Sequence, residues 1–170
     1  ASAAVTSTVN VAATDDGPVA VADATTVSED SAATAINVLA NDTDADGGAI
    51  SITAVTQPAN GAVVITGGGT GLTYQPNPNY CNNPPGTTLD TLTYTLTPGG
   101  ATATVAITVT CVDDSPSALD DSATVTEDSP ANAVSVLAND TDSDAGPITI
   151  NAVTQPTNGT VAITGGGSGL

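Results

Sequence analysis

Short runs in which apolar and polar residues alternate with a period of two recur along this chain. Residues 90–97 alternate leucine and tyrosine with threonine, and residues 101–110 alternate valine and isoleucine with threonine and alanine. A period of two is typical of half-buried β-strands, and no helical period of useful length is present. The pattern predicts strands at 18–28, 33–40, 49–56, 62–66, 71–75, 90–97 and 101–110.

Clusters of turn-forming residues separate these runs. They lie at 57–61, 67–69, 77–79 and 98–100 and consist mainly of Gly, Pro and Asn. Seven short strands in about a hundred residues, separated in this way, predict an all-β fold, a Greek-key β-sandwich of the Ig or cadherin-like kind. Its core would consist of small aliphatic side chains with Tyr74 and Tyr94. Such a core is thin, so additional cross-links should matter.

An internal repeat organises the sequence. A shift of 98 residues aligns residues 2–72 with residues 100–170 without a gap. The repeat predicts tandem sandwiches arranged end to end. We expect residues 1–14 to be the last strand of a preceding repeat, residues 15–112 a complete cadherin-like repeat, and residues 113–170 a truncated second repeat.

Two interpretations of these partial repeats are open. In the first, the chain is a segment of a much longer array. In the second, residues 1–12 of one molecule complete the sheet of residues 113–170 in the next molecule, a known mode of strand addition. Against the second, the stretch equivalent to 73–98 would still be missing from the completed sheet.

The charge of the chain excludes several classes of function. It has 18 acidic residues and no Lys, Arg or His, so its net charge is −18. Binding of nucleic acid or of an anionic membrane surface needs basic residues. Most nucleophilic and acid–base devices are absent as well, and without Trp or Phe the chain has few platforms for a sugar substrate. We therefore expect no enzyme, and no membrane insertion, because apolar runs fall far short of ~20 residues.

The acidic residues follow a recurrent pattern. The loop 42–46 and its repeat 140–144 carry a carboxylate at every second position, a spacing that suits a hard cation with several oxygen ligands. Counting strand directions places three acidic groups at one junction between repeats. These groups are Glu29 and Asp30, the linker residues Asp113 and Asp114, and the loop residues Asp140, Asp142 and Asp144. The equivalent half-site consists of Asp15, Asp16, Asp42, Asp44 and Asp46.

Calcium is the cation that this arrangement predicts, with two or three ions per junction from an estimate of roughly six to eight oxygens per ion. The loop is not an EF-hand, because no helices flank it. The alternative is that the acids cap turns and keep the surface soluble. We adopt this alternative for Asp23, Asp90, Asp120 and Asp121.

Several of these motifs resemble a known family. The Asp-x-Asp loop, the acidic linker 112–116 and the Glu-Asp-Ser after the first strand look like the calcium framework of cadherins. The longer motifs Val-Leu-Ala-Asn-Asp-Thr-Asp and Ala-Val-Thr-Gln-Pro-x-Asn-Gly resemble more closely the cadherin-like, bacterial Ig-like tandem repeats of large calcium-dependent bacterial surface proteins. The resemblance covers essentially the whole chain. It implies an extracellular, cell-surface array used as a stalk, adhesin or filament.

The same resemblance carries ligand roles over to particular residues. These are Glu29, Asp113, Asp114, Asp142 and Asp144. The chain departs from animal cadherins because it lacks their basic residues and their N-terminal strand-exchange tryptophan. Cell–cell adhesion by that mechanism is therefore not expected.

The two cysteines lie at the same end of the predicted sandwich. Cys81 follows the fifth predicted strand and Cys111 ends the seventh. We expect a disulfide that closes a loop of about thirty residues, which fits an oxidising, extracellular setting. Two free or intermolecular thiols are the alternative.

Together these observations predict an extracellular structural repeat, stiffened by Ca²⁺ at the junctions. Its partners would be adjacent repeats of the same chain or neighbouring copies in a fibre. Two alternatives are an adhesion module that holds a surface glycan or protein on loops such as 67–71, and an acidic protein adapted to high salt without a specific metal site.

Overall fold

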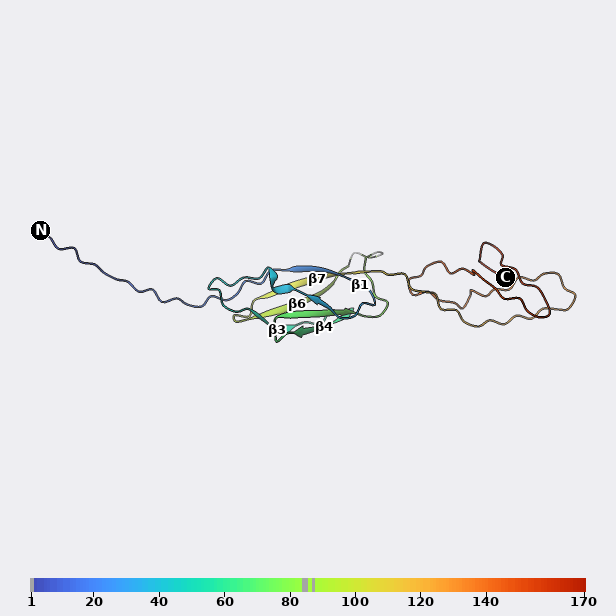
Figure 1. Cartoon of the computed structure of the whole chain (residues 1–170), viewed down its shortest axis with the longest axis horizontal. Coiled ribbons are helices and arrows are strands. Elements are labelled where there is room, and N and C mark those ends of the chain that lie inside the picture. Colours follow the sequence, from blue (N-terminus) through green and yellow to red (C-terminus); the bar gives the residue numbers. More distant parts are fainter. Residues whose placement is uncertain (1, 84–85, 87) are drawn as a thin grey trace. The chain divides into compact units, whose positions relative to one another are not determined.

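A computed structural model describes residues 2–83, 86 and 88–170 of the chain. Residue 1 of the predicted segment 1–14, and three residues of the predicted repeat 15–112, lie outside the described residues. The chain forms two compact units, Ala1–Thr110 and Cys111–Leu170, which we call the first and the second unit. The strands of the first unit are shown in Figure 1.

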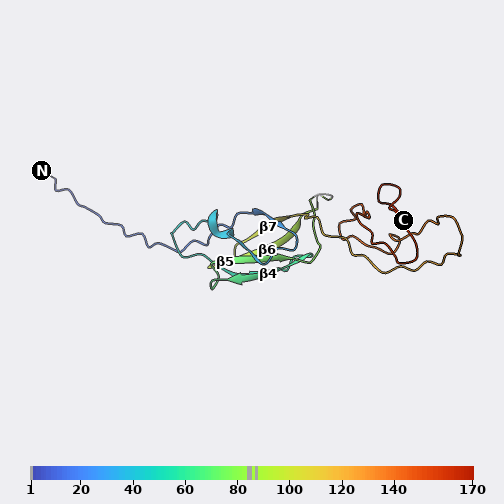
Figure 2. The same cartoon turned by 45° about the vertical axis from the view of Figure 1, so that its right-hand side comes forward.

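The first unit is a sandwich of two sheets. Its elements are β1 (Asp23–Ser28), β2 (Thr34–Ile36), the 3₁₀ turn η1 (Val38–Ala40), β3 (Ser51–Val55), β4 (Gly61–Thr66), β5 (Gly71–Pro76), β6 (Asp90–Thr97) and β7 (Thr102–Thr110). One sheet has the order β1-β7-β6-β3 and the other β2-β5-β4. Figure 2 shows β4 and β5 side by side, facing β6 and β7. The predicted all-β, Ig-like sandwich is confirmed.

The strand pairing confirms the predicted strand directions. β1 runs parallel to β7, and the pairs β2–β5, β3–β6, β4–β5 and β6–β7 are antiparallel. The loop after β1 therefore lies at the end of the sandwich where β7 finishes. The loop after η1 lies at the opposite end, where the chain enters the unit.

The core of the first unit follows from the alternation. Leu92, Tyr94 and Leu96 on β6 are buried, while the threonines between them turn away from the core. Tyr74 on β5 is also fully buried, as predicted. The described apolar residues that are buried all belong to this one cluster. Burial of large aromatic and aliphatic side chains is the main favourable term for such a small unit.

The prediction of a continuous strand over 33–40 is wrong. β2 ends at Ile36, and residues 38–40 form a 3₁₀ turn. The turn places Val38 in the core, and the side-chain amide of Asn41 donates to the carbonyl of Ala22 at 3.3 Å. Burial of Val38 and this long-range hydrogen bond replace the continued pairing of β2 with β5.

The first predicted strand, 18–28, begins later than expected, at Asp23. Val19 pairs only with Thr43, as an isolated bridge. The backbone N–H of Val21 donates to the Asp42 carboxylate at 2.7 Å instead of to a neighbouring strand. A side chain from a distant loop therefore takes the place of a ladder partner over this stretch.

The second unit repeats the local geometry of residues 13–72 without named strands. Ser117 and Thr141 form the bridge that corresponds to Val19 and Thr43 in the first unit. Val134 and Leu170 exchange two backbone hydrogen bonds, and their equivalents on β2 and β5 lie opposite each other in the ladder. No residue from 111 to 170 corresponds to β6 or β7, which pair with β3 and β1 in the first unit. The equivalents of β1 and β3 therefore have no ladder within this unit.

Candidate functional site

Asp42 ties the acidic loop to the core of the first unit. Its carboxylate is buried, with the Tyr94 hydroxyl 3.0 Å from each oxygen and the Val21 N–H 2.7 Å from Oδ1. A buried carboxylate is tolerated only with such hydrogen bonds. Asp42 therefore holds the loop in place.

Asp44 and Asp46 shape the rest of this loop and bind it to the chain that enters the unit. Asp44 Oδ1 accepts the N–H groups of Asp46 at 3.0 Å and Gly48 at 3.2 Å. Asp46 Oδ2 accepts the N–H of Asp16 at 2.5 Å. Among the described residues, the buried Asp44 Oδ2 has no hydrogen-bond partner. We call this arrangement of the Asp16, Asp44 and Asp46 segments the linker–loop clasp.

The second unit builds the same clasp from its own residues. Asp142 Oδ1 accepts the N–H groups of Asp144 at 2.9 Å and Gly146 at 3.2 Å. Asp144 Oδ2 accepts the N–H of Asp114 at 2.5 Å. Asp140 Oδ1 accepts the N–H of Leu119 at 2.8 Å, as Asp42 does with Val21. The clasp is thus a local structure that the repeated sequence encodes twice.

Two further predicted acids of the first unit, Glu29 and Asp30, lie at its other end. Glu29 is buried, with 3 % of its surface exposed, and its N–H donates to the carbonyl of Thr110 at 2.9 Å. Asp30 has a positive φ of 55°, and its Oδ1 accepts the N–H of Asn79 at 3.0 Å. Aspartate tolerates this left-handed conformation better than most residues. Both acids therefore have defined positions where β1 ends.

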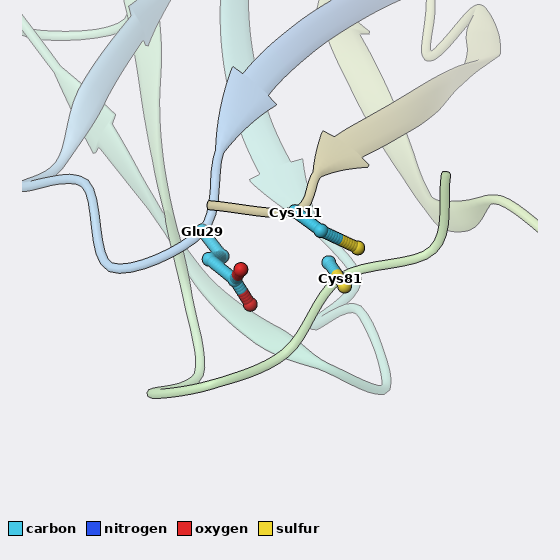
Figure 3. A group of neighbouring side chains, drawn as sticks. All are labelled: Glu29, Cys81 and Cys111. Atoms are coloured by element: carbon cyan, nitrogen blue, oxygen red, sulfur yellow. The ribbon is translucent and has the colours of Figure 1, made fainter. Parts of the chain in front are cut away.

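Cys81 and Cys111 form a disulfide, as predicted. Figure 3 shows Glu29 beside the two cysteines, and possible ligand atoms of the three residues lie within 4.8 Å of one another. Metal binding by cysteine requires the thiolate, and both sulfurs here are oxidised to the disulfide. The group is therefore a cross-link beside a buried carboxylate, not a metal centre.

No other group of three potential ligand residues within the described part of the chain lies this close together. Each unit positions its linker and loop acids near one another through the clasp, at hydrogen-bond distance between backbone and carboxylate. The convergence of the clasp of one repeat with Glu29 and Asp30 of the repeat before it stays a prediction.

Asp90 has a structural role that the sequence interpretation missed. It is buried, its carboxylate accepts the N–H groups of Ala59 at 3.1 Å and Asn60 at 3.2 Å, and the Tyr74 hydroxyl lies 3.0 Å from Oδ2. The alternation through 90, 92, 94 and 96 places Asp90 on the buried face of β6, and that signal could have identified it.

Asn82 was missed as well, and no sequence signal pointed to it. Its side chain is buried, its Nδ2 donates to the Ile107 carbonyl at 3.1 Å, and its Oδ1 accepts the Val109 N–H at 2.8 Å. Asn82 therefore fastens the segment after Cys81 to β7.

The buried tyrosines are set up as hydrogen-bond donors. Burial raises the pKa of Tyr74, and the hydrogen bond to Asp90 raises it further. Burial likewise raises the pKa of Tyr94, with a further contribution from the hydrogen bond to Asp42. Burial also raises the pKa of Asp23, partly offset by the hydrogen bond from Tyr94. The hydroxyls of Tyr74 and Tyr94 therefore stay protonated at neutral pH. They donate to Asp90 and Asp42 and so stabilise the loops that these carboxylates hold.

No described helix is long and apolar enough to cross a lipid bilayer. A search of curated proteins and a search of solved structures found no match to the chain.

A family model described as a bacterial Ig domain matches the chain twice, at residues 15–110 and 113–169. The two matches cover most of the chain and coincide with the two copies of the repeat. The first contains the two-sheet sandwich, and the second contains the repeated clasp. The chain therefore belongs to the bacterial Ig domain family, of which it carries two tandem segments.

Proposed function

We propose that this chain is part of an extracellular stalk, adhesin or filament in which Ca²⁺ binds at the junctions between successive repeats. Bacterial Ig domains are commonly extracellular or surface-exposed structural repeats, and the family is typically non-enzymatic. The observation that carries the calcium proposal is the linker–loop clasp, which occurs in both units and leaves the buried Asp44 Oδ2 without a hydrogen bond among the described residues.

The donor set fits a hard cation. Every candidate ligand is a carboxylate, and the sequence has no Lys, Arg or His to neutralise them. Two carboxylates ~5 Å apart repel by roughly 3 kcal/mol at an effective dielectric constant near 20. Calcium accepts six to eight oxygen ligands and removes this repulsion, whereas softer metals prefer sulfur or imidazole.

In this proposal the linker and loop acids hold the ions. They are Asp15, Asp16, Asp44 and Asp46 in the first unit and Asp113, Asp114, Asp142 and Asp144 in the second. Glu29 and Asp30 supply oxygens from the repeat that precedes the second clasp. Asp42 and Asp140 orient the loops, because their carboxylates already accept hydrogen bonds from the entering chain.

The mechanical consequence is a switch in stiffness. Without calcium, repulsion between acidic groups keeps successive repeats apart and lets the junction flex. With calcium, the same groups share ions and the junction becomes rigid. A series of such junctions would give a long, stiff structure.

The test is a calorimetric titration of the 170-residue chain with Ca²⁺, together with thermal unfolding at fixed ionic strength. We expect binding, and a rise in melting temperature when calcium replaces sodium. Saturation at a hundredfold excess over Kd corresponds to about 2.7 kcal/mol. An equal melting temperature in both salts would contradict the proposal and favour adaptation to high salt.

A variant pair makes this test specific. Replacing Asp44 and Asp142 together by Asn turns one charged carboxylate ligand of each clasp into a neutral amide. The double variant should lose most of the calcium-induced rise in melting temperature. The matched control replaces the exposed Asp120 and Asp121 by Asn, which changes the net charge equally. If the control lost the calcium effect to the same extent, the ions would be a diffuse atmosphere without a site at the clasp.

A further inference from the structure

The Cys81–Cys111 disulfide joins the point where the chain leaves the sandwich to a segment that precedes β6. Cys111 directly follows Thr110, the last residue of β7, and Cys81 lies between β5 and β6. The loop that the disulfide closes therefore contains the whole of β6 and β7. These two strands supply much of the buried core.

The disulfide connects Cys111 to an inner strand of each sheet. β7 lies between β1 and β6 in the four-stranded sheet, and β5 lies between β2 and β4 in the three-stranded sheet. The peptide bond after Thr110 joins Cys111 to β7, and the disulfide joins it to Cys81, which follows β5. A pull on the chain beyond Cys111 therefore acts on both sheets at once.

Hydrogen bonds also hold the segment after Cys81, but they are weaker than the covalent link. The backbone N–H groups of Asn82 and Asn83 donate to the carbonyl of Val109 at 2.9 and 3.1 Å, and Asn82 Oδ1 accepts the Val109 N–H at 2.8 Å. Each bond of this kind exchanges with water at a small net cost. Under tension these bonds can open one after another, whereas the S–S bond stays closed.

The chain enters the sandwich at the end opposite to Cys111. β1 begins at Asp23 and runs parallel to β7, so its first residue lies where β7 starts. Before β1, the N–H of Val21 donates to the Asp42 carboxylate. Tension along a stalk would enter at this end and leave at Cys111, along the direction of the strands.

We propose that the disulfide transmits tension from β5 to the chain beyond Cys111 and keeps β6 and β7 off the covalent path that is stretched. When the sandwich opens under load, the chain from β1 to Cys81 extends. The residues between the two cysteines do not extend, because the disulfide holds both ends of this loop together. The use of this limit in a stalk rests on the proposed function, whereas the limit itself is a property of the chain and does not need calcium.

The length of the closed loop sets the size of the effect. It contains about thirty residues, and at roughly 3.3–3.6 Å per residue of extended chain it withholds about 100 Å. The part that extends, from β1 to Cys81, has about sixty residues. An opened repeat with the disulfide therefore reaches about two thirds of the length that it reaches without it.

The test is single-molecule force spectroscopy of the 170-residue chain, held by its two ends, with and without a dithiol reductant. We expect the first unit to release about 100 Å more extension in reductant, and to open at a lower force. The double variant Cys81→Ala, Cys111→Ala should release the longer extension in both conditions. This variant keeps the test decisive where the folded sandwich shields the disulfide from the reductant.

Tyr94→Phe is the matched control, because it weakens the same sandwich and leaves the cross-link in place. It should open at a lower force than the parent chain and release the same extension as the parent, short without reductant and about 100 Å longer with it. The length of the released chain thus separates the disulfide from stability alone.

Equal extensions of the parent chain and of the double cysteine variant without reductant would overturn the proposal. An oxidised Tyr94→Phe chain as long as the double cysteine variant would overturn it as well. Equal opening forces for the parent and the double cysteine variant would overturn the sharing of load between the sheets. All measurements are made in calcium and in chelator, and an absence of any calcium effect would contradict only the calcium proposal. A sandwich that opens at negligible force would contradict the stalk function and leave the difference in length intact.

Discussion

The hydroxyl of Tyr94 lies 3.0 Å from both carboxylate oxygens of Asp42 in the core of the first unit. Tyr94 is on β6 and fully buried, and Asp42 follows η1 at the end where the chain enters. The same carboxylate accepts the N–H of Val21 before β1. One buried acid therefore connects the middle of a sheet, the entering chain and the loop that carries Asp44 and Asp46.

Replacement of Tyr94 by Phe should destabilise the first unit by about 1–3 kcal/mol. The change removes the hydroxyl and leaves the buried Asp42 carboxylate with the Val21 N–H as its remaining close partner. Urea unfolding followed by circular dichroism gives the free energy of unfolding.

Tyr80 provides the control for this substitution. It is partly buried, and among the described residues its hydroxyl accepts one long hydrogen bond, at 3.5 Å, from the side chain of Asn82. Tyr80→Phe should change the free energy of unfolding much less than Tyr94→Phe. Equal losses would mean that the hydrogen bond to Asp42 contributes nothing specific.

The stability of the first unit should fall at alkaline pH. The pKa values of Tyr74 and Tyr94 are raised in the folded state, whereas tyrosine in the unfolded chain has a pKa of about 10. Below that pH both states hold the proton, so the full stability is present. As the pH rises above about 10, the unfolded state ionises first and gains stability relative to the folded state.

Free energies of unfolding measured between neutral pH and strongly alkaline pH check this dependence. Tyr94→Phe should reduce the loss of stability per pH unit, because one of the two tyrosines responsible is removed. A parent chain whose stability is flat through this range would show that the two hydroxyls titrate alike in the folded and unfolded states.

The alternating sequence was sufficient to predict the strands, apart from the bounds of the first two. Leu92, Tyr94 and Leu96 occupy every second position, so a strand that buries one of them buries all three. The repeat was found by aligning the sequence with itself. The strand directions, and the position of both cysteines at one end of the sandwich, follow from counting successive strands. These features depend on spacing within a strand and on counting turns.

The parts that could not be predicted depend on single contacts between distant residues. The late start of β1 and the turn at η1 result from Asp42 and Asn41, whose side chains replace ladder partners. The burial of Asp90 could have been predicted from the alternation in β6, but its partners, backbone N–H groups 30 residues away, could not. Periodicity gives the face of a residue and says nothing of a polar partner that far along the chain.

Reduction of the Cys81–Cys111 disulfide should destabilise the first unit by about 3–4 kcal/mol, because it closes a loop of about thirty residues. The double replacement Cys81→Ala and Cys111→Ala should reproduce the effect. Chemical denaturation with and without reductant measures it. The reductant should leave the stability of the double variant unchanged. A parent chain that is equally stable in both conditions would show that the hydrogen bonds of Asn82 and Asn83 are sufficient to hold this segment to β7.

Gly61 and Gly159 occupy equivalent positions in the two units, yet they should respond oppositely to alanine. A Cβ at Gly61 would lie 2.6 Å from the Tyr74 hydroxyl oxygen, so the ring must shift and strain its contact with Asp90. Among the described residues, a Cβ at Gly159 would meet only Pro156, at 3.9 Å. Overpacking a core costs about 1–3 kcal/mol, whereas alanine in an unstrained position stabilises by about 0.4–1 kcal/mol.

Thermal unfolding of the two variants at low concentration tests this difference. Gly61→Ala should melt well below the parent chain, and Gly159→Ala should melt at or above it. The comparison is internal, since the same chemical change is made at the same place in the repeat. If Gly159→Ala were as damaging as Gly61→Ala, the close approach to the Tyr74 ring would not be the cause of the loss at Gly61.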